Sequence, residues 1–587
     1  MKRDELSLII GGHAGQGVQT VARAFARTCA RAGFGVFLNQ EYPSNIKGEH
    51  NYFDVMVAEG SVGAHTRQAD ALLALDAKTV NLHVDRIAPG GALIFDREGA
   101  EVSPVDRGLK ISEIQRDDIT VLDVPFSQFA QDVGGSARMT NAVGIGSLHG
   151  LLGFDFDLLA DLLRQSLSKL SDQIVQQNLD GAKRAYDLTR DNYWEKLGLV
   201  LDRPQARRRM LISGNDAVAL GALKAGVKFY SSYPMSPSSG VLSLMSQRAR
   251  DYDLVALLTE DEISAAGAAV GASFGGVRAM TGTSGGGFCL MSEFLGLAGM
   301  VEVPLVVLEG QRPGPATGLP TRTEQGDLKF VLSAHQGDCP RIVVAPGDPP
   351  EAFELTFEAF NLADRYQTPV IVLTDKHLAE SFWTYEPFQT ESLTIDRGQR
   401  LGEKELGTIK DYKRFRLTES GVSPRTRPGI PGGVFKATGN EHNEYGLLSE
   451  DARSRAAQTD KRLRKTAALD VSQTGARLHG DPGAPVTLVG WGSTKRAILE
   501  AMAVLKETRK INCNFLQVIY AEPFPTSRVS EVIRDAGRTL LVENNATGQM
   551  GDLIRQKTGL AITDRILKCD GRQFYRDELA EMIAERL

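Results

Sequence analysis

This chain of 587 residues has few cysteines, no long hydrophobic run and no strong excess of charge of either sign. Its five cysteines stand far apart, so we expect neither structural disulfides nor a metal site built from paired cysteines. No apolar run reaches the length of a membrane span, and charges of both signs are interspersed around a net charge of −6. These features argue against a membrane protein and against a nucleic-acid-binding surface. Met1–Ser7 has no signal-peptide pattern, so we expect a cytoplasmic location.

The chain does contain the alternation of predicted strands and helices that is typical of several α/β domains. A chain of this length is too long for a single hydrophobic core. Changes in composition predict four segments, at 1–200, 208–390, 391–480 and 481–587. The first, second and fourth alternate strands with helices, which predicts the α/β class with several doubly wound domains. The third is rich in charge, glycine and proline, and predicts an extended irregular linker or arm.

The first segment opens with a glycine-rich turn. The expected order is strand, tight loop, amphipathic helix and strand, at Leu6–Ile10, Gly11–Gly17, Gln19–Ala32 and Gly35–Leu38. Backbone N–H groups at such a helix start can receive a phosphate, with Gly12, Gly15 and Gly17 as candidates. The glycine spacing differs from that of dinucleotide-binding loops, so a tight turn without a ligand is an equally good interpretation. A second stretch, Gly134–Asn141, either lies beside this loop or only caps the next helix.

The second segment predicts a parallel sheet. Its strands are expected at Met210–Ser213, Val227–Tyr230, Leu254–Thr259, Arg278–Thr283, Leu305–Leu308 and Pro369–Leu373, with helices at Asp216–Ala225, Glu262–Phe274 and Phe288–Met300. The alternation resumes in the fourth segment, with strands at Val486–Trp491, Asn514–Tyr520 and Thr539–Glu543 and helices at Thr494–Lys506, Val529–Ala536 and Gly548–Thr558.

Three acidic residues, Glu260, Asp261 and Glu262, stand where a predicted strand meets an Ala/Gly-rich helix. The carboxyl ends of parallel strands are where such sheets bind ligands. Thiamine catalysis needs a carboxylic acid at N1′ of the cofactor to drive tautomerisation of the 4′-amino group, and an apolar site keeps that acid's pKa high. Acids at a helix start are also ordinary N-terminal caps, and taken alone these three fit capping better.

Three hydroxyl-rich loops follow other predicted strands, at Tyr233–Ser239, Thr281–Gly287 and Gln311–Arg322. The third adds the guanidinium groups of Arg312 and Arg322. Hydroxyl groups and a guanidinium gathered at one sheet edge can bind a carboxylate. Each loop alone would be ordinary turn chemistry, so their joint occurrence carries the argument.

These motifs resemble the 2-oxoacid:ferredoxin oxidoreductases. Tyr233–Ser239 is similar to the family's Tyr-Pro-Ile-Thr-Pro-Ser-Ser, and Glu-Asp-Glu-Ile-Ser-Ala-Ala, Thr-Ser-Gly-Gly-Gly and Gly-Pro-Ala-Thr-Gly-Leu-Pro-Thr follow in the family's order. Gly11–Gly17 with Tyr42–Asn51 resembles the small γ domain, and Glu543–Gln549 resembles the end of the α subunit. The resemblance implies an α subunit with a fused γ domain, of the 2-oxoglutarate synthase type. It also implies that 208–390 is a thiamine pyrimidine-binding domain and 481–587 a transketolase C-terminal-like domain.

The resemblance implies roles for individual residues. Glu262 matches the glutamate expected at N1′, with Glu260 in reserve. The other residues expected on the pyrimidine side are Tyr233, Pro234, Thr283, Ser284 and Gly285. The residues expected to bind the substrate are Ser236, where the family has Thr, together with Arg312 and Thr321. Two further departures from the family are Met235 for Ile and Gly286 for a frequent Pro.

A distal carboxylate distinguishes 2-oxoglutarate from pyruvate. By charge count we expect Arg322 to bind it, and Lys47 or Arg341 could serve as well. Pyruvate and branched-chain or aryl 2-oxo acids therefore stay open as substrates. Two other functions also stay open: a non-catalytic nucleotide-binding subunit whose only site is the glycine loop, and a dehydrogenase that uses the N-terminal βαβ unit.

The resemblance gives a reason why two motifs are absent from the sequence. The sequence has no Gly-Asp-Gly…Asn pattern, through which thiamine enzymes bind the diphosphate and Mg²⁺, and no cysteine pair spaced for an iron–sulfur cluster. The resemblance implies that a β subunit supplies both, including a 4Fe–4S cluster, in an (αβ)2 assembly. The implied reaction is CoA-dependent oxidative decarboxylation of 2-oxoglutarate to succinyl-CoA and CO2 with reduction of ferredoxin, or the reverse carboxylation. The loop with Gly12, Gly15 and Gly17 is our candidate for binding the CoA phosphates.

Overall fold

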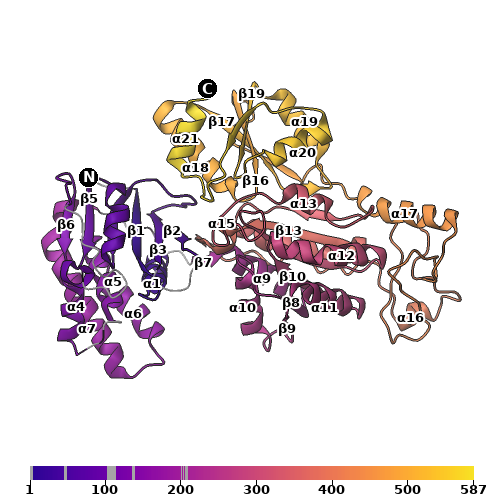
Figure 1. Cartoon of the computed structure of the whole chain (residues 1–587), viewed down its shortest axis with the longest axis horizontal. Coiled ribbons are helices and arrows are strands. Elements are labelled where there is room, and N and C mark those ends of the chain that lie inside the picture. The colour runs from indigo at the N-terminus through magenta and orange to yellow at the C-terminus, as the bar shows by residue number, and fades with distance from the viewer. Residues whose placement is uncertain are drawn as a thin grey trace. The chain divides into compact units, whose positions relative to one another are not determined.

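The chain folds into two compact units that interleave along the sequence (Figure 1). Unit 1 comprises Met1–Ile212, Ser381–Phe388 and Tyr575–Leu579, and unit 2 comprises Ser213–Glu380, Gln389–Phe574 and Ala580–Leu587. The computed structural model describes residues 4–44, 49–101, 114–134, 136, 139–199, 201, 204 and 209–587. Within these ranges no helix is both long and apolar enough to cross a membrane.

Unit 1 contains an eight-stranded mixed sheet in the order β6-β5-β4-β1-β3-β2-β14-β7. Its strands are β1 Glu5–His13, β2 Gly35–Glu41, β3 His50–Ala58, β4 Ala69–Ala74, β5 Ile87–Phe95, β6 Thr120–Asp123, β7 Met210–Ser213 and β14 Phe382–Tyr385. β1, β4, β5 and β6 are parallel, whereas β3 is antiparallel to both β1 and β2. β1 extends through the predicted loop residues Gly11 and Gly12, because these pair with β3.

Alternating residues of β1 enter two different cores, as the period of a strand requires. Leu8 and Ile10 join the larger core, and Ile9 joins the smaller core on the opposite face. The larger core includes residues of α1 Val18–Arg31, α4 Phe126–Asp132, α5 Thr140–Leu151, α6 Phe156–Ser166 and α7 Asp172–Thr189. The smaller core includes Val80 of α2, Ala77–His83. The remaining α-helices of unit 1 are the short α3 Arg97–Glu101 and α8 Glu195–Leu197.

The prediction that Met210–Ser213 opens the second sheet is wrong, because β7 lies at the edge of the unit 1 sheet beside β14. β14 pairs antiparallel with β2, with Trp383 opposite Phe37. Trp383 is fully buried, its ring lies 5.2 Å from that of Phe37, and its indole N–H donates to the Gly63 carbonyl oxygen. A strand from far along the chain therefore completes this sheet.

Unit 2 contains a seven-stranded sheet in the order β18-β12-β13-β11-β10-β8-β9. Its strands are β8 Phe229–Ser232, β9 Val255–Leu258, β10 Ala279–Thr283, β11 Leu305–Gln311, β12 Ile342–Val344, β13 Pro369–Asp375 and β18 Tyr520–Glu522. All neighbours are parallel except β18, which runs antiparallel to β12. Its helices are α9 Gly214–Lys224, α10 Ser239–Arg248, α11 Glu262–Phe274, α12 Gly285–Met300, α13 Leu328–Ser333, α14 Pro349–Tyr366 and α15 Lys376–Glu380.

A five-stranded sheet with the order β15-β17-β16-β19-β20 follows in the same unit. Its elements are β15 Ala476–His479, β16 Val486–Trp491, α18 Thr494–Arg509, β17 Cys513–Val518, α19 Thr526–Asp535, β19 Arg538–Glu543, α20 Gln549–Thr558 and β20 Asp564–Leu567, and α21 Arg576–Ala584 ends the chain's regular structure. Trp491 and Leu516 of this sheet share one apolar core with Val307 and Ile371 of the seven-stranded sheet. The two sheets of unit 2 are thus packed together.

The predicted irregular arm contains more structure than expected. Besides the short α16 Glu403–Leu406, it forms the 16-residue helix α17, Ala452–Ala467. Helix α17 escapes a search for apolar periodicity because the residues that it buries are polar: Gln458, Lys461, Arg462 and Lys465. Its packing depends on ion pairs, which a sequence alone does not assign.

Candidate active site

The predicted hydroxyl-rich loops meet at the carboxyl edge of the seven-stranded sheet, where β8, β10 and β11 end. Arg312 follows β11, and its Nη1 donates to the backbone oxygen of Ser236, after β8, at 2.8 Å. Thr283 ends β10, and its hydroxyl lies 3.8 Å from the Met235 sulfur and 3.5 Å from a Glu262 carboxyl oxygen. The structure therefore brings together Ser236, Glu262, Thr283 and Arg312, as expected of strand ends in a parallel sheet.

The three acids before α11 divide into different roles. Asp261 is the N-cap, and its carboxylate accepts from the Ser264 backbone N–H at 2.7 Å. Hydrogen bonds from Ser264, first its backbone N–H and then its hydroxyl, lower the pKa of Asp261. Glu262, the first helical residue, is only 3% exposed, whereas Glu260 is exposed. Capping therefore accounts for Asp261 but not for the buried carboxyl of Glu262.

Glycines at the start of α12 allow the helix to approach this carboxyl closely. A Cβ at Gly287 would lie 2.0 Å from the Thr283 hydroxyl and 2.5 Å from a Glu262 carboxyl oxygen. At the exposed Gly286 the nearest atom would be 4.0 Å away. Among the described residues, the buried hydroxyls of Tyr230, Thr281 and Ser284 have no hydrogen-bond partner.

This arrangement fits a thiamine pyrimidine. A buried carboxyl, Glu262, lies beside a helix start without side chains, and the buried hydroxyls of Thr281 on β10 and Ser284 at the N-cap of α12 have no partner among the described residues. Unpartnered buried polar atoms are unusual in proteins and often mark functional positions. Tyr233 and Pro234, which we placed on the same side of the cofactor, are exposed, while Ser284 is buried at the N-cap of α12.

Arg312 is half-buried and lies among carboxyl groups. Burial lowers the pKa of its guanidinium, while the charges of Asp327, Glu262 and Glu309 act in the opposite direction. Within the described part of the chain, its one hydrogen bond is that to the Ser236 carbonyl. The remaining guanidinium N–H groups can therefore bind an anion, and a planar fork of donors matches a carboxylate.

Sequence analysis missed Glu309 and did not single out Asp327. Glu309 lies on β11, opposite Thr283 in the register of the two parallel strands, and is fully buried. Asp327 follows the arginine-containing loop, and a Cβ at Gly285 would lie 2.5 Å from its carboxyl oxygen. An acid within the apolar strand Leu-Val-Val-Leu-Glu-Gly-Gln was the available signal.

The loop that carries Asp327 is held by the motif Glu543–Gln549. Gln325 exchanges hydrogen bonds with Asn544, through the Gln325 N–H to Asn544 O at 2.7 Å and the Asn544 N–H to Gln325 Oε1 at 3.0 Å. The Asn545 side chain donates to Gln325 O, and the Gln549 side chain donates to Gly326 O. The motif Glu543–Gln549 therefore fixes a loop of the candidate site.

The other predicted substrate residues lie less directly at this edge. Thr321 is buried, and the backbone N–H of Arg322 closes a turn onto Leu319 O at 3.1 Å. Arg341 stands at the start of β12, the opposite edge of the sheet from Arg312, and its Nη1 donates to Val331 O at 2.9 Å. The structure does not bring Arg341 to the candidate site. Lys47 lies outside the described residues.

In unit 1, the glycine loop contacts the second glycine-rich stretch. Gly15 and Gly17 have positive φ angles of 98° and 82°, in the region that favours glycine. A Cβ at Gly17 would lie 2.1 Å from the Asn141 amide nitrogen. Asn141 ends Gly134–Asn141, of which 135, 137 and 138 lie outside the described residues. The two stretches therefore lie side by side, one of the two alternatives that the sequence left open.

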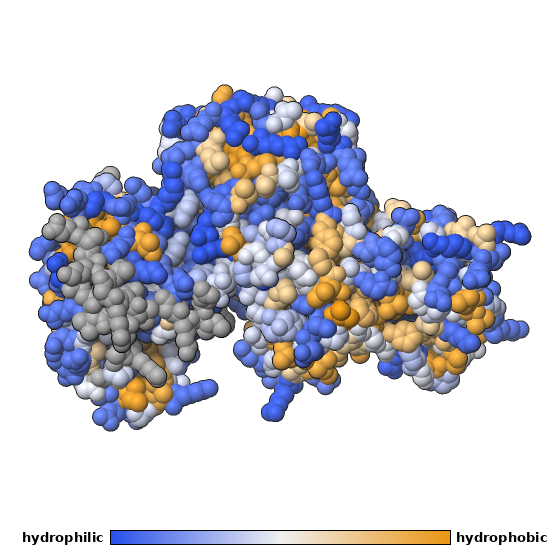
Figure 2. All heavy atoms as spheres, in the orientation of Figure 1, coloured by the Kyte–Doolittle hydropathy of each residue, from blue (hydrophilic) through white to orange (hydrophobic). Residues whose placement is uncertain are grey.

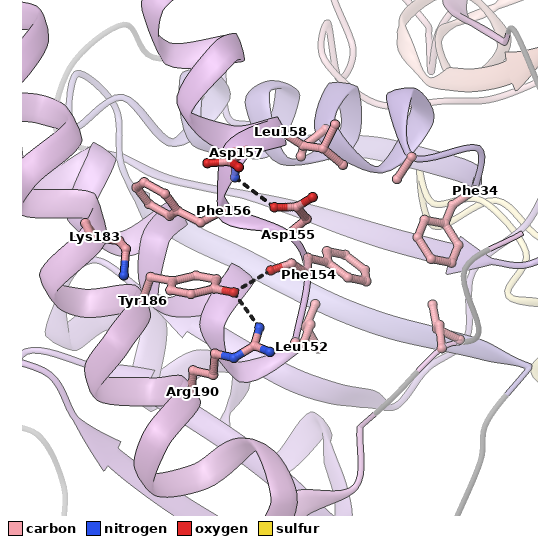
Figure 3. A pocket seen from close by; sticks show the side chains of 14 residues that line it. Phe34, Leu152, Phe154, Asp155, Phe156, Asp157, Leu158, Lys183, Tyr186 and Arg190 are labelled. Atoms are coloured by element: carbon pink, nitrogen blue, oxygen red, sulfur yellow. Dashed lines mark hydrogen bonds between the residues drawn. The ribbon is translucent and has the colours of Figure 1, made fainter. Parts of the chain in front are cut away.

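A cavity of about 530 Å³ also lies in unit 1 (Figure 3). Phe154, Tyr186 and Arg190 line it, with the Tyr186 hydroxyl donating to Phe154 O at 2.8 Å. Thr28 and Ala32 place it at the C-terminal end of α1, whereas the glycine loop precedes the N-terminal end. None of the predicted site residues lines this cavity.

Comparison with known proteins gives consistent similarities along the chain. Residues 220–461 match a family described as pyruvate flavodoxin/ferredoxin oxidoreductase, thiamine diP-bdg, and residues 7–188 match pyruvate ferredoxin/flavodoxin oxidoreductase. Subunit alpha of 2-oxoacid:ferredoxin oxidoreductase 1 from Sulfurisphaera tokodaii is 34% identical, over 98% of this chain and 97% of that one. The 2-oxoglutarate oxidoreductase subunit KorA of Mycobacterium tuberculosis is 28% identical, over 98% and 90%.

A solved structure is similar over the same extent. The 2-oxoglutarate:ferredoxin oxidoreductase from Magnetococcus marinus, with 2-oxoglutarate, coenzyme A and succinyl-CoA bound, has a TM-score of 0.90 and 29% identity, and 99% of each chain is covered. This similarity confirms the predicted fold class of several α/β domains.

Proposed function

Because this chain belongs to the family of 2-oxoacid:ferredoxin oxidoreductase alpha subunits, we propose that it acts on 2-oxoglutarate together with a β subunit. The reaction is oxidative decarboxylation: 2-oxoglutarate and CoA give succinyl-CoA and CO2, and two electrons pass to ferredoxin. The reverse carboxylation uses the same site with reduced ferredoxin. The observation that carries the proposal is the buried carboxyl of Glu262 beside Thr283 and the α12 glycines.

Thiamine diphosphate, when bound, supplies a carbon nucleophile and a sink for the electrons left by CO2. Glu262 holds the proton at N1′ of its pyrimidine, and burial keeps water away from that carboxyl. Ser284 and Gly285 at the start of α12, with Tyr233 and Pro234 after β8, line the pyrimidine side. Mg²⁺ and the diphosphate belong to the β subunit, as does the 4Fe–4S cluster, because no motif for either occurs in this sequence.

Arg312 binds the carboxylate next to the keto carbon, with Ser236 and Thr321 as hydroxyl partners. Its backbone bond to Ser236 orients the guanidinium and leaves N–H groups for the substrate. Arg322 binds the distal carboxylate. Support for 2-oxoglutarate comes from that second arginine and from whole-chain similarity to the KorA subunit and to the Magnetococcus marinus enzyme.

The β subunit docks on an apolar strip beside the site. The exposed edge strand β9 contributes Val255, Leu257 and Leu258, which are 56%, 39% and 65% exposed, and α11 adds Ile263. Orange apolar surface is visible over this part of unit 2 (Figure 2). An exposed, apolar edge strand is a liability unless something covers it, and Glu262 lies directly beyond this strand. Two such αβ pairs form (αβ)2. In unit 1, Gly12, Gly15 and Gly17 bind the CoA phosphates.

Viologen reduction by the purified αβ complex, with 2-oxoglutarate or pyruvate as substrate, tests the proposal. Glu262→Gln is expected to lower kcat by about 10²–10⁴-fold, the usual contribution of an acid–base group. Glu260→Gln is the matched control, one exposed acid two residues away, and is expected to behave as the wild type. Preference for pyruvate would contradict the substrate assignment alone. Full activity of Glu262→Gln would contradict the mechanism and favour a non-catalytic subunit.

A further inference from the structure

Glu309 is a buried acid without a partner of opposite charge at hydrogen-bonding distance. It is fully buried on β11, and neither of its carboxyl oxygens has a hydrogen-bond partner among the described residues. One oxygen of Asp327 is buried and unpartnered as well. An ionised carboxylate left in this state would be strongly destabilising, so the site must contain protons that satisfy these oxygens.

The two carboxyl groups lie in the same part of the site, because Glu309 and Gln311 are two residues apart on one face of β11 and the Gln311 side chain holds the Asp327 backbone N–H at 3.0 Å. Burial raises the pKa of Glu309 well above its usual value, and the charge of Asp327 raises it further. Burial also raises the pKa of Asp327, whereas Glu309 and the charge of Arg312 lower it. Two carboxylates have no donor between them, and a hydrogen bond forms only when one carries a proton. The arrangement assigns that proton to Glu309 and the negative charge to Asp327.

Asp327 is held in this position by the polypeptide around it. Its backbone N–H donates to the Gln311 side chain at 3.0 Å, and that side chain donates to Thr374 O at 3.0 Å. The neighbouring Gln325 is fixed by Asn544 and Asn545. The backbone is therefore anchored at Gln325 and at Asp327 itself, which keeps the Asp327 carboxyl in this part of the site.

We propose that Glu309 and Asp327 share one proton, and that this proton keeps Arg312 available for an anionic substrate. Asp327 alone balances part of the guanidinium charge. A second charge on Glu309 would leave Arg312 between two carboxylates, with Glu262 nearby, and would repel the substrate carboxylate. Glu309 and Asp327 are positioning residues in this scheme. Their effect on substrate binding by Arg312 rests on the proposed function.

Titratable groups from several elements surround this pair. They are Glu262 of α11, Cys289 of α12, Arg312 after β11, Glu324 shortly before Asp327, and Asp375 at the end of β13. Four of the five are acidic or weakly acidic, and Arg312 is the one cation among them. The surrounding charge therefore favours retention of the shared proton at neutral pH.

Infrared spectroscopy of the αβ complex, without substrate, observes the proton directly. At neutral pH the wild type is expected to show the C=O band of a protonated carboxyl that Glu309→Gln lacks and Glu262→Gln retains. Asp327→Asn removes the like charge and lowers the pKa of Glu309, so the band is expected to be lost at a lower pH than in the wild type. If Glu309→Gln does not fold, this shift in Asp327→Asn carries the test, and a band that titrates as in the wild type would contradict the shared proton.

The pH dependence of KM gives the second readout. Once the shared proton is lost, the wild-type KM for the 2-oxo acid is expected to rise about tenfold per pH unit, whereas in Glu309→Gln the rise disappears. A merely structural role would leave this rise in place. Absence of the wild-type carboxyl band at neutral pH would overturn the proposal. If the band is present but the complex turns over no 2-oxo acid, the shared proton is confirmed and the proposed function is contradicted.

Discussion

Two buried glutamates lie at opposite ends of β11, and the charged groups around them have opposite signs. Glu302 precedes β11, and its carboxyl lies 2.6 Å from Lys461 Nζ and 2.7 Å from Lys465 Nζ of α17. Burial alone would raise its pKa, but Lys465, Lys461 and Arg414 lower it far below the usual value. Glu309 lies near the end of β11, and its pKa is raised by burial and by Asp327.

Equal burial therefore has different consequences at the two ends. The paired Glu302 attaches α17 to the sheet edge opposite the site, where Lys465 also donates to Gln367 O and Arg414 to Glu302 O. The unpaired Glu309 lies at the edge that carries Arg312 and Glu262. Partners of opposite charge indicate a structural role, and their absence in a site indicates a functional one.

Removal of Glu302 is expected to have the largest effect on stability. Glu302→Ala leaves Lys461 and Lys465 buried without their counter-ion, which should lower the free energy of unfolding by about 3–5 kcal/mol. Urea unfolding of the αβ complex measures it. Glu531→Ala, which breaks the exposed pair with Arg528, is the control and should cost less than about 1 kcal/mol. Equal effects of the two variants would mean that the buried cluster does not hold the arm.

Gly287→Ala tests the close approach at the other edge. The added methyl would overlap Thr283 and Glu262, so we expect a loss of about 1–3 kcal/mol together with loss of activity. Gly286→Ala, one residue earlier and exposed, has room and should be neutral or stabilising by up to about 1 kcal/mol. Thermal unfolding and viologen reduction measured on both variants check the difference. A tolerated Gly287→Ala would contradict the packing of α12 on Glu262.

The pH dependence of stability should have opposite signs at the two glutamates. Glu302 has a lowered pKa, so its contribution is present above the usual carboxyl pKa and is lost as pH falls through the folded value. Glu309 has a raised pKa, so the folded state loses stability as pH rises from the usual carboxyl pKa toward the folded value.

Unfolding of Glu302→Gln and Glu309→Gln over a series of pH values measures these slopes. The free energy of unfolding of Glu302→Gln should be lower than that of the wild type, and this difference should become smaller toward acid pH. The free energy of unfolding of Glu309→Gln should increase relative to that of the wild type toward alkaline pH. Each slope is limited to about 1.4 kcal/mol per pH unit, the value for one proton. Differences that stay constant with pH would show that neither group changes its protonation on unfolding.

Local patterns in the sequence predicted much of unit 2. Helix α11 begins and ends at the predicted residues, Glu262 and Phe274, and β16 likewise spans Val486–Trp491. Small residues and a cap mark the start of the helix, and continuous apolar runs mark buried parallel strands. Parallel topology then places the ends of β8, β10 and β11 at one edge, which is why the site loops were predictable.

The sequence by itself determined the α/β class, the family and the residue types at the site, because these depend on local periodicity and motifs. Only the tertiary structure decided that Trp383 completes the sheet of unit 1, that Lys461 pairs with Glu302, and that Gln311 holds Asp327 in the same part of the site as Glu309. These contacts join different elements of the chain. The apolar strand around Glu309 indicates a buried acid, but the local sequence does not say which charged groups each residue will meet. Burial and partner charge, which set whether such a group holds its proton, arise when distant segments pack together.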